Sequence, residues 1–379
     1  MSDNSLKIVA DALQASQSLS YEQAQTMPSA FYTAPAVLDL EREALFRREW
    51  ICVGRIDEVA KPGDFMTFDI LDEPVLVIHG DDGQIRALSN VCRHRGMVIA
   101  SGQGNRKRLA CPYHAWTYDS RGRLIGAPHM NERPDFDRTA ICLPEFRSEV
   151  WQGFLFVTLD AETPPLAPRL ADLEPLVRNY HFDEMTLRYV AEGVWETNWK
   201  CLMENFMEGY HLSPLHRTTL HPVNPTKLCK HFPPGEAYFG YHAGFSPELP
   251  RTTLGHPDLS DEEAHRCVMF AVPPALTVGG AADYSSFLCI QPETPDRVRV
   301  KQGLFFHGDH WTQDQIDHAV ELFENTMAED KDMLVDLKRG LHASRYASGP
   351  MAPADYEGPI WDFIQYLGRR LAPVLPAPD

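Results

Sequence analysis

The sequence lacks the features that mark membrane and secreted proteins. No apolar run in its 379 residues approaches the length of a membrane-spanning helix, and the N-terminal MSDNSLKIVADALQ has no basic segment followed by an apolar core. The eight cysteines are scattered and only two lie in a motif, so a disulfide framework is not indicated. We expect a protein of the reducing cytoplasm, with neither a signal peptide nor a membrane partner.

Positive charge and nucleotide-binding motifs are also scarce. Lys and Arg number 35 against 53 Asp and Glu, and the resulting net charge of −18 argues against nucleic acid as a partner. No G-x-G-x-x-G dinucleotide fingerprint occurs, and no segment reads as a flavin domain. The hydrophobic fraction of 44% is ordinary for a globular protein, and the length suffices for two domains.

Patterns along the chain predict three parts. Residues 1–45 look helical, residues 46–165 show short strands and turns, and residues 166–379 mix strands with helices. A proline-rich connector, AETPPLAPRLADLEPL, marks the later boundary. Within 46–165 the Asp81-Asp82-Gly83 turn between apolar runs predicts a hairpin, and WQGFLFVTL predicts a strand, so this part reads as a small all-β domain.

The most specific motif lies inside that all-β part. Cys92-x-His94 is followed, after sixteen residues, by Cys111-x-x-His114, so each of two loops offers one Cys and one His. Four such ligands suit either structural zinc or a [2Fe–2S] cluster in which two Cys hold one iron and two His the other. Zinc sites usually pair Cys with Cys at close spacing, and therefore the pattern favours the cluster, with Trp116 as a shield.

A second constellation lies in NWKCLMENFMEGYHLSPLH, residues 198–216. On one continuous helix Glu204, Glu208 and His211 would share a face, and Pro214 would break the helix so that His216 folds back towards His211. Two imidazoles with carboxylates nearby suit a divalent transition metal. The alternative is a pair of histidines satisfied by hydrogen bonds at a helix end.

A long amphipathic helix is predicted from Thr312 to Leu341, with a capping box formed by Thr312 and Gln315. Its apolar stripe skips one position, and Asp330 occupies that gap; we expect Glu329 and Asp332 to lie off the stripe in solvent. A buried carboxylate needs a cationic partner or a metal, so Asp330 either pairs with a buried Arg or Lys or completes a two-His, one-carboxylate iron site. The stripe residues are Ile316, Val320, Phe323, Met327, Leu334, Leu337 and Leu341.

These motifs, CRHRG…CPYHAW, ENFMEGYHLSPLH and AEDKDM, resemble in content and order those of Rieske non-haem iron oxygenases. The resemblance covers nearly the whole chain. It implies an α+β fold, with an all-β Rieske domain and a helix-grip catalytic domain built on an antiparallel sheet. It also implies that Glu208 bridges the two metal centres, and Glu rather than Asp there looks more like carnitine-type monooxygenases. The implied ligands are Cys92, His94, Cys111 and His114 for the cluster, and His211, His216 and Asp330 for a mononuclear Fe(II).

The implied activity is that of the terminal oxygenase of a multicomponent system, with O₂ as co-substrate. Our first expectation is monooxygenation leading to N- or O-dealkylation of a small amine, betaine or amide; aromatic ring cis-dihydroxylation is the alternative. Two readings from other classes are a non-catalytic Rieske electron carrier, which needs no Asp330 on a buried stripe, and a zinc-dependent hydrolase, which would have no cluster.

The resemblance further implies partners. Since the chain shows no nicotinamide or flavin motif, electrons must come from a separate NAD(P)H-dependent reductase, with or without a ferredoxin. The chain is short for a subunit that works with a separate β-subunit, so we expect a homotrimer in which each cluster serves the iron of a neighbouring subunit. A region rich in proline, glycine and aromatic residues is expected to help line the substrate pocket; its aromatics include Phe232, Tyr238, Phe239, Tyr241, Phe245 and Phe270.

Overall fold

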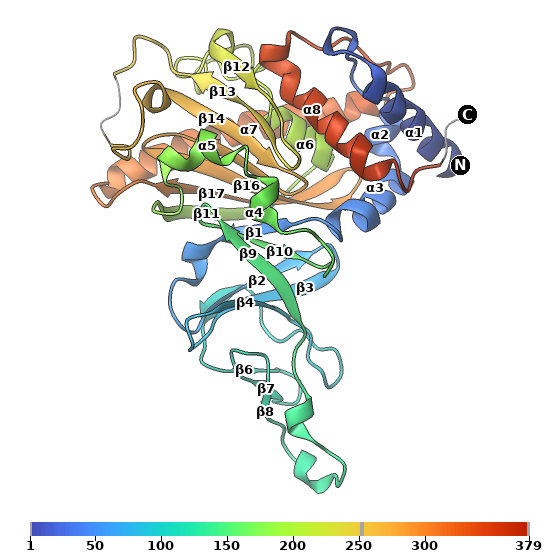
Figure 1. Ribbon diagram of the computed structural model, residues 1–379, viewed down its shortest axis with the longest axis vertical. Coiled ribbons are helices and arrows are strands. Elements are labelled where there is room, and N and C mark those ends of the chain that lie inside the picture. Colours follow the sequence, from blue (N-terminus) through green and yellow to red (C-terminus); the bar gives the residue numbers. More distant parts are fainter. Residues whose placement is uncertain (1, 251–253, 377–379) are drawn as a thin grey trace. The chain divides into compact units, whose positions relative to one another are not determined.

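The structure, a computed structural model, describes residues 2–250 and 254–376, and the chain forms two compact units (Figure 1). The larger unit combines Met1–Phe46 with Pro165–Asp379, and the smaller unit is Arg47–Pro164. None of the described helices is both long and apolar enough to cross a lipid bilayer. Helices combined with antiparallel sheets confirm the predicted α+β class.

The smaller unit is built from strands. Its main sheet has the order β1-β10-β9-β4-β3-β2-β5, a second sheet has the order β6-β7-β8, and the pairings are antiparallel. The strands of the main sheet are β1 (Ile51–Arg55), β2 (Asp64–Ile70), β3 (Glu73–His79), β4 (Ile85–Ser89), β5 (Gln103–Asn105), β9 (Glu145–Trp151) and β10 (Phe154–Thr158). The second sheet comprises β6 (Leu109–Ala110), β7 (Thr117–Tyr118) and β8 (Leu124–Gly126), and the 3-10 turns are η3 (Ile56–Val59), η4 (Met130–Glu132) and η5 (Arg138–Ala140).

Two expectations for this unit have different outcomes. The predicted hairpin is confirmed: β3 pairs with β4, and Gly83 at the turn has φ of 76°, a left-handed conformation that glycine adopts without strain. The single strand predicted over 151–159 is wrong. β9 ends at Trp151, a turn at Gln152 and Gly153 reverses the chain with φ of 50° and 76°, and β10 begins at Phe154.

The N-terminal segment is helical, as predicted, and is part of the larger unit. A buried ion pair shows why it packs there: Lys200 Nζ lies 2.6 Å from a carboxylate oxygen of Glu41, and Trp199 Nε1 donates to the other oxygen at 2.8 Å. Both side chains of the ion pair are almost completely buried. The elements of the segment are α1 (Ser2–Ser18), η1 (Tyr21–Gln23), α2 (Ser29–Thr33), α3 (Pro35–Glu41) and the π-helical η2 (Arg42–Phe46).

The larger unit is organised on one antiparallel sheet of seven strands, in the order β11-β17-β16-β15-β14-β13-β12. The strands are β11 (Thr186–Trp195), β12 (Cys229–Phe232), β13 (Phe239–Gly244), β14 (Arg266–Val272), β15 (Leu276–Gly280), β16 (Tyr284–Thr294) and β17 (Arg297–Phe306). Its remaining helices are α4 (Leu166–Arg169), α5 (Glu174–Val177), η6 (Arg178–Tyr180), α6 (Trp199–Phe206), η7 (Thr226–Leu228), η8 (Glu263–His265), α7 (Gln313–Leu341) and α8 (Ala354–Leu371).

The predicted long helix is confirmed as α7. Thr312 is its N-cap, and the capping box with Gln315 is present. Asp330 is buried with 4% of its surface exposed, as the gap in the stripe predicted, whereas Leu337 is 41% exposed and its assignment to the buried stripe was wrong. Glu324 ties the helix to the sheet, because its carboxylate accepts hydrogen bonds from Tyr189 and Gln302 at 2.5 and 2.8 Å.

The continuous helix predicted through Glu208 and His211 is wrong, because α6 ends at Phe206. Met207 N still donates back to the carbonyls of Met203 and Glu204, but Gly209 N donates to the carbonyl of Tyr356, at the start of α8, at 2.9 Å. A side chain at Gly209 would come within 2.4 Å of the Cys229 sulfur. This close approach of a distant segment ends the helix before the break that Pro214 was expected to make.

Candidate metal centres and active site

The two loops that carry the Cys–His motif have matching backbones. In the first loop Cys92 N donates to the carbonyl of Met97, and Gly96 N donates back to the Cys92 carbonyl. In the second, Cys111 N donates to Trp116, and Ala115 N donates back to Cys111. Gly96 and Ala115 have φ of 74° and 56°, so each loop closes through one left-handed residue at the same offset from its cysteine.

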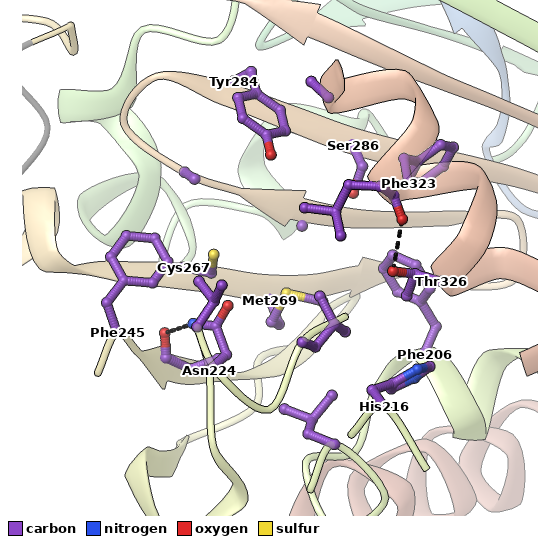
Figure 2. Close-up of a pocket in the computed structure, with 18 of the residues that line it drawn as sticks. Phe206, His216, Asn224, Phe245, Cys267, Met269, Tyr284, Ser286, Phe323 and Thr326 are labelled. Atoms are coloured by element: carbon purple, nitrogen blue, oxygen red, sulfur yellow. Dashed lines mark hydrogen bonds between the residues drawn. The ribbon is translucent and has the colours of Figure 1, made fainter. Parts of the chain in front are cut away.

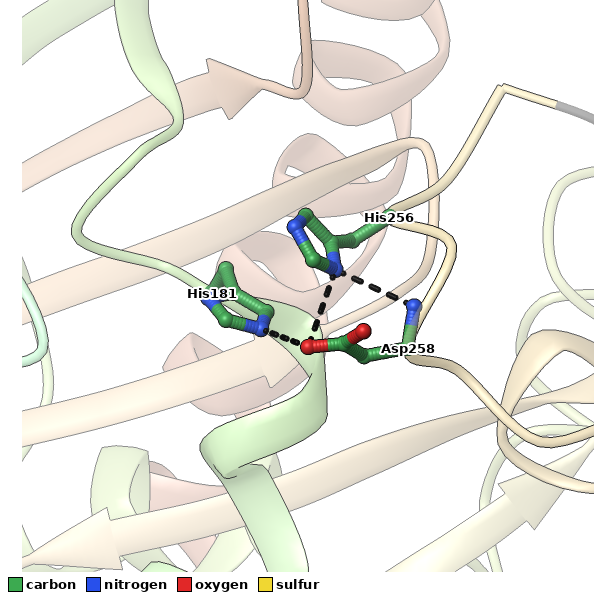
Figure 3. Close-up of side chains that lie close together, drawn as sticks. All are labelled: His181, His256 and Asp258. Atoms are coloured by element: carbon green, nitrogen blue, oxygen red, sulfur yellow. Dashed lines mark hydrogen bonds and ion pairs between the residues drawn. The ribbon is translucent and has the colours of Figure 1, made fainter.

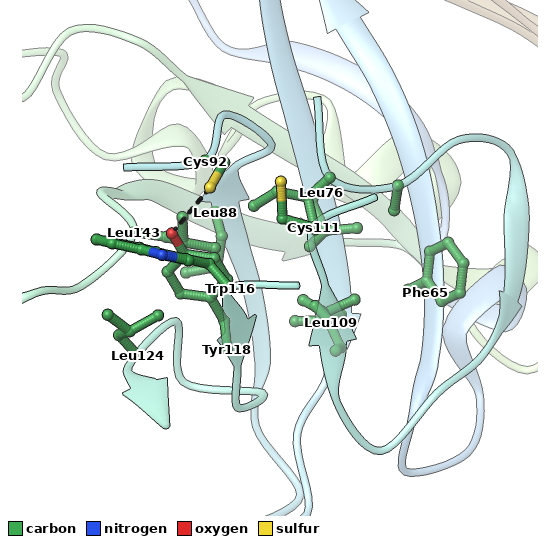
Figure 4. Packing of buried hydrophobic residues seen from close by; sticks show 13 residues of the cluster. Phe65, Leu76, Leu88, Cys92, Leu109, Cys111, Trp116, Tyr118, Leu124 and Leu143 are labelled. Carbon is green, nitrogen blue, oxygen red and sulfur yellow. Dashed lines mark hydrogen bonds between the residues drawn. The ribbon is translucent and has the colours of Figure 1, made fainter. Parts of the chain in front are cut away.

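The motif has a buried cysteine side and an exposed histidine side. Cys92 and Cys111 belong to the core cluster of the smaller unit and are 3% and 4% exposed, beside Trp116 and Tyr118 (Figure 4). Tyr118 Oη lies 3.3 Å from the Cys92 sulfur. His94 and His114 are exposed, and their rings lie 4.8 Å apart between centroids.

The predicted shielding role of Trp116 has a structural basis. Its ring stacks on that of His94, with centroids 4.7 Å apart and an interplanar angle of 9°. Tyr113 packs on His114 with centroids 3.7 Å apart. Each imidazole therefore has one face covered by an aromatic ring, which fixes its orientation.

The donor atoms of this motif do not converge as one zinc ion would require. Among the described residues, no three of Cys92, His94, Cys111 and His114 bring ligand atoms within 4.8 Å of one another. A single zinc ion needs donors at about 2.0–2.3 Å. Paired cysteines on one side and paired histidines on the other fit two irons of a [2Fe–2S] cluster better.

In the larger unit the structure brings together the three residues that were predicted to bind a mononuclear iron. His211, His216 and Asp330 bring one ligand atom each within 4.8 Å of the others. Asp330 Oδ1 lies 3.7 Å from His211 Nε2 and 3.2 Å from His216 Nε2. His216 is fully buried, yet its Nε2 has no hydrogen-bond partner. An imidazole nitrogen left unpaired beside a carboxylate fits a metal ligand and contradicts the alternative of histidines satisfied by hydrogen bonds.

The alternative of a salt bridge for Asp330 is also contradicted. In the described chain the two histidines lie within ion-pair distance of Asp330, and no Arg or Lys does. Asn205 Nδ2 donates to Asp330 Oδ1 at 3.2 Å. Asn205, on α6, therefore orients the carboxylate towards the two rings, and this contact was not predicted.

Each histidine of the triad is held from behind by a carboxylate. Glu208 contacts His211 Nδ1 closely through one oxygen, and its other oxygen accepts from the backbone N–H of Tyr210 and of His211. Burial by itself lowers the pKa of His211, but Glu208 and Asp330 outweigh it and raise that pKa above its usual value. Fixing the far ring nitrogen in this way sets the tautomer that leaves Nε2 free for a metal.

Glu329 performs the same task for His216, and the expectation that it lies in solvent was wrong. Its Oε2 is 2.7 Å from His216 Nδ1 and accepts a hydrogen bond from Thr219 Oγ1 at 2.6 Å. The side chain is 30% exposed, so only its outer edge meets solvent. Sequence position next to Asp330 was the one signal that could have pointed to it.

Glu204 does not belong to the metal site. The Tyr32 hydroxyl donates to its carboxylate, at 3.0 and 3.1 Å from the two oxygens, and burial raises the pKa of Glu204 to about 8. The end of α6 at Phe206 separates Glu204 from Glu208 and His211, which follow in irregular backbone.

The triad opens onto a cavity of about 380 Å³ in the larger unit (Figure 2). Of the six aromatic residues suggested by the sequence, Tyr241 and Phe245 line it, while the other four lie in the core. Three further aromatic side chains of the lining were missed: Phe206, Tyr284 and Phe323. The stripe of α7 could have indicated Phe323. The remaining wall is mainly aliphatic. Its sulfur-containing and polar members include Cys267, Met269, Asn224, Ser286 and Thr326.

Asp283 is the one carboxylate of the described lining that does not belong to the triad. One of its oxygens accepts from the backbone N–H of Tyr284 at 2.9 Å, and no described cationic side chain pairs with it. Burial raises the pKa of Asp283, because the cost of burying its charge outweighs the opposing effect of the backbone hydrogen bonds to the carboxylate. The cavity thus contains an acidic group, and its described lining has no Lys or Arg to pair with that group.

Comparison with known proteins agrees with the geometry. Residues 49–147 match the family model "Rieske [2Fe-2S] domain", and residues 178–372 match "Ring hydroxylating alpha subunit (catalytic domain)". The chain belongs to the ring-hydroxylating alpha subunits that carry a Rieske domain, which confirms the resemblance seen in the sequence. The family's [2Fe–2S] cluster, mononuclear iron and use of O₂ come with that membership.

Individual relatives are oxygenase subunits. The "Carnitine monooxygenase oxygenase subunit" of Acinetobacter baumannii is 30% identical over 340 residues, which span 85% of this chain and 87% of that protein. The "Glycine betaine monooxygenase oxygenase subunit" of Chromohalobacter salexigens is 37% identical over 200 residues, 52% of this chain and 44% of that one.

Solved structures show the same fold. A quaternary ammonium Rieske monooxygenase in complex with L-carnitine has a TM-score of 0.81 at 24% identity, covering 95% of this chain and 98% of that one. Naphthalene 1,2-dioxygenase from Rhodococcus sp. has a TM-score of 0.80 at 20% identity, covering 97% and 99%. The helix-grip architecture with an antiparallel sheet is thereby confirmed.

Proposed function

We propose that the chain is a terminal oxygenase that hydroxylates an N-alkyl carbon of a small cationic amine and so releases the alkyl group as an aldehyde. For a trimethylammonium substrate, O₂, two electrons and two protons give the dimethylammonium product, formaldehyde and water. The observation that carries the substrate class is the cavity beside the triad, with aromatic walls and the unpaired carboxylate of Asp283.

Cation recognition follows from the lining. Aromatic faces attract ammonium groups, and a desolvated carboxylate gains most from a positive partner that enters without bulk water. Asp283 in the free protein has no such partner among the described residues. A bound cation would lower the pKa of Asp283 and stabilise its ionised form.

The described lining has no Lys or Arg to pair with a substrate carboxylate. Within the amine class the cavity therefore favours a cation whose remainder is uncharged over a zwitterionic betaine. The relatives named above are a carnitine and a glycine betaine monooxygenase, so this preference would separate the chain from them. Aromatic ring dihydroxylation is the second candidate, because the same apolar wall and the naphthalene dioxygenase likeness suit a flat ring.

We assign the metal ligands as follows. His211, His216 and Asp330 would hold the mononuclear iron, and Asn205, Glu208 and Glu329 would position them. Cys92 and Cys111 would hold one iron of the cluster, and His94 and His114 the other. When bound, these groups supply electron transfer and activation of O₂. The surrounding residues of the chain hold the rings, exclude water and place the substrate carbon near the open side of the triad.

The assembly belongs to the same proposal. The exposed histidines stand among exposed apolar side chains, with Met97 and Val98 each 42% and Tyr113 54% exposed. Such a patch at an electron-transfer site suits a protein partner. We propose a homotrimer in which Glu208 links His211 to a cluster histidine of the neighbouring subunit, and a separate NAD(P)H-dependent reductase, with or without a ferredoxin, that supplies the electrons. We also place the protein in the cytoplasm.

The test is a substrate panel with a surrogate reductase. Alkyl trimethylammonium compounds, betaines, N-alkyl amides and an aromatic acid would be compared by O₂ uptake and formaldehyde release. We expect the first group to have the highest kcat/KM. Conversion of the aromatic acid to a diol without any dealkylation would favour the second candidate instead.

The Asp283→Asn variant tests whether this carboxylate recognises the cation. Loss of a charged partner costs about 1.5–3 kcal/mol of binding free energy, so kcat/KM for the cation should fall about 10- to 100-fold. The kcat/KM for a neutral amide should stay unchanged. Asp309→Asn is the matched control, because that carboxylate is 95% exposed and pairs with Arg188. Equal losses for the cation and the amide in Asp283→Asn would contradict a role in charge recognition.

A further inference from the structure

A second group of metal-ligand side chains lies in the larger unit, outside the triad and the cavity lining. It consists of His181, His256 and Asp258 (Figure 3). His181 follows η6, and the other two belong to the connection between β13 and η8. One donor atom from each lies within 4.8 Å of the others, the same criterion that the triad meets.

The spacing of the donors suits a small divalent ion. Asp258 Oδ2 is 2.9 Å from His181 Nε2 and 3.6 Å from His256 Nδ1. Zinc bonds of about 2.0–2.1 Å in a tetrahedral site separate neighbouring ligands by about 3.3 Å, and the two distances bracket that value. The corresponding distances in the triad are 3.2 and 3.7 Å.

The two imidazole rings of the cluster lie face to face. The His181 and His256 rings stack with centroids 3.6 Å apart. The backbone N–H of Asp258 donates to His256 Nδ1 at 3.1 Å, and a metal bound at this nitrogen would replace that hydrogen bond.

Behind the rings stands a further carboxylate. Glu184 has one oxygen 3.4 Å from His181 Nδ1 and the other 3.9 Å from His256 Nε2. It therefore faces the nitrogen of each ring that points away from Asp258. Glu208 and Glu329 also lie behind the histidines of the triad, and there they are close enough for hydrogen bonds. A carboxylate behind a ligating imidazole orients the ring and raises its basicity.

We propose that His181, His256 and Asp258 bind one divalent transition-metal ion, for which Zn²⁺ is the best match, with water completing its coordination. Two imidazoles and one carboxylate are the donors that zinc takes in open sites. The site is separate from both iron centres, and the proposal does not depend on the substrate class.

A metal here would stiffen one wall of the cavity. Gly255 packs on Ala282 so closely that a β-carbon on the glycine would lie 2.9 Å from both the Cβ and the carbonyl oxygen of Ala282. The next residue, Asp283, lines the cavity, and its carbonyl accepts from His307 N at 2.9 Å. The His307 ring in turn lies against His256, with centroids 5.5 Å apart. The ion would pin the Gly255–Asp258 connection beside the residue that we assign to cation recognition.

The experiment is a zinc titration of the holoenzyme. Protein with its full iron content would be incubated with Zn²⁺, passed through a desalting column and analysed for zinc and iron together. We expect one retained zinc per chain with no loss of iron. His181→Ala and the nearly isosteric Asp258→Asn should each abolish the retained zinc, and thermal unfolding should shift upward with zinc in the wild type alone.

His318→Ala is the matched control, because this exposed histidine of α7 lies outside the cluster, and it should retain zinc as the wild type does. Zinc that enters only as iron leaves, unchanged by Asp258→Asn, would overturn the proposal. So would a wild type that retains no zinc, since the cluster would then be a set of His–carboxylate ion pairs.

Discussion

Glu329 and Asp330, adjacent on α7, engage opposite nitrogens of the same imidazole, that of His216. Glu329 Oε2 lies 2.7 Å from Nδ1, and Asp330 Oδ1 lies 3.2 Å from Nε2. One turn of one helix thus supplies both a proposed iron ligand and the group that orients a second ligand. The side chain that looked solvated in the sequence is therefore tied to the metal site.

Glu329→Gln should weaken iron binding without touching the cluster. Loss of the carboxylate behind a ligating histidine typically costs about 10- to 100-fold in metal affinity. Iron would be measured by titration of chelator-treated protein, with the visible spectrum of the cluster as an internal reference. Asp332→Asn, on the same helix but exposed, is the control. Unaltered iron affinity in Glu329→Gln would show that the negative charge of Glu329 is not needed to hold His216.

Asp330→Ala should lower total iron by about one per chain, from about three, and leave the cluster spectrum intact. Substrate-coupled O₂ uptake should vanish. Cys111→Ala should instead abolish the cluster spectrum, whereas Cys142→Ala, at an exposed free cysteine, should not. Full activity in Asp330→Ala would mean that the triad is wrongly drawn and that Glu329 or Asp332 becomes the candidate ligand.

Glu208→Gln tests the proposed link between subunits. The glutamine amide has an NH₂ group in place of one carboxylate oxygen, so one of the N–H groups that now donate to Glu208 would face another donor. We therefore expect His211 to be held less well and iron affinity to fall, and iron must be supplied in excess. With both centres loaded, the reductase should still reduce the cluster, but single-turnover electron transfer from cluster to iron should slow by orders of magnitude. Glu204→Gln, a buried glutamate outside the metal site, should keep the wild-type rate. Equal rates in the two variants would reduce Glu208 to a positioning role.

The stability of the protein should carry a pH signature from Glu204. Its pKa rises from 4.5 to about 8 in the folded chain, so between these values the folded state holds a proton that the unfolded state has released. The free energy of unfolding therefore falls as pH rises through this window, by up to about 1.4 kcal/mol per pH unit. Glu204→Gln does not titrate, yet its amide oxygen still accepts from Tyr32.

Thermal unfolding of the two proteins at several pH values would measure the effect. The variant should gain on the wild type steadily from about pH 5 to about pH 8. Glu321→Gln, at an exposed position of α7, serves as the control. A constant difference between Glu204→Gln and wild type across the range would show that Glu204 is ionised in the folded protein.

Short-range patterns in the sequence predicted several features of the structure correctly. The skipped position of the apolar stripe identified Asp330 as a buried carboxylate, and the Thr312–Gln315 pair marked the start of α7. Both depend on residues close together in the chain. The two Cys–His loops were readable for the same reason, since each is a tight turn closed by its own hydrogen bonds.

What the sequence did not reveal depends on contacts between distant segments. The end of α6 follows from the approach of Tyr356 and Cys229 to Gly209. Glu329 meets His216 across 113 residues, and His181 meets Asp258 across 77. No periodicity or spacing rule reaches over such separations, so the orienting carboxylates and the second histidine cluster appear only in three dimensions.

In the function that we propose, this chain, supplied with electrons, couples O₂ to dealkylation of a cationic amine. The most direct measurement is the stoichiometry of a reaction containing the holoenzyme, a reductase, NADH and an alkyl trimethylammonium substrate. We expect equal amounts of NADH oxidised, O₂ consumed and formaldehyde formed, with no turnover when the reductase is omitted. Fully iron-loaded enzyme that forms no formaldehyde from any amine, but converts an aromatic ring to a diol, would contradict it.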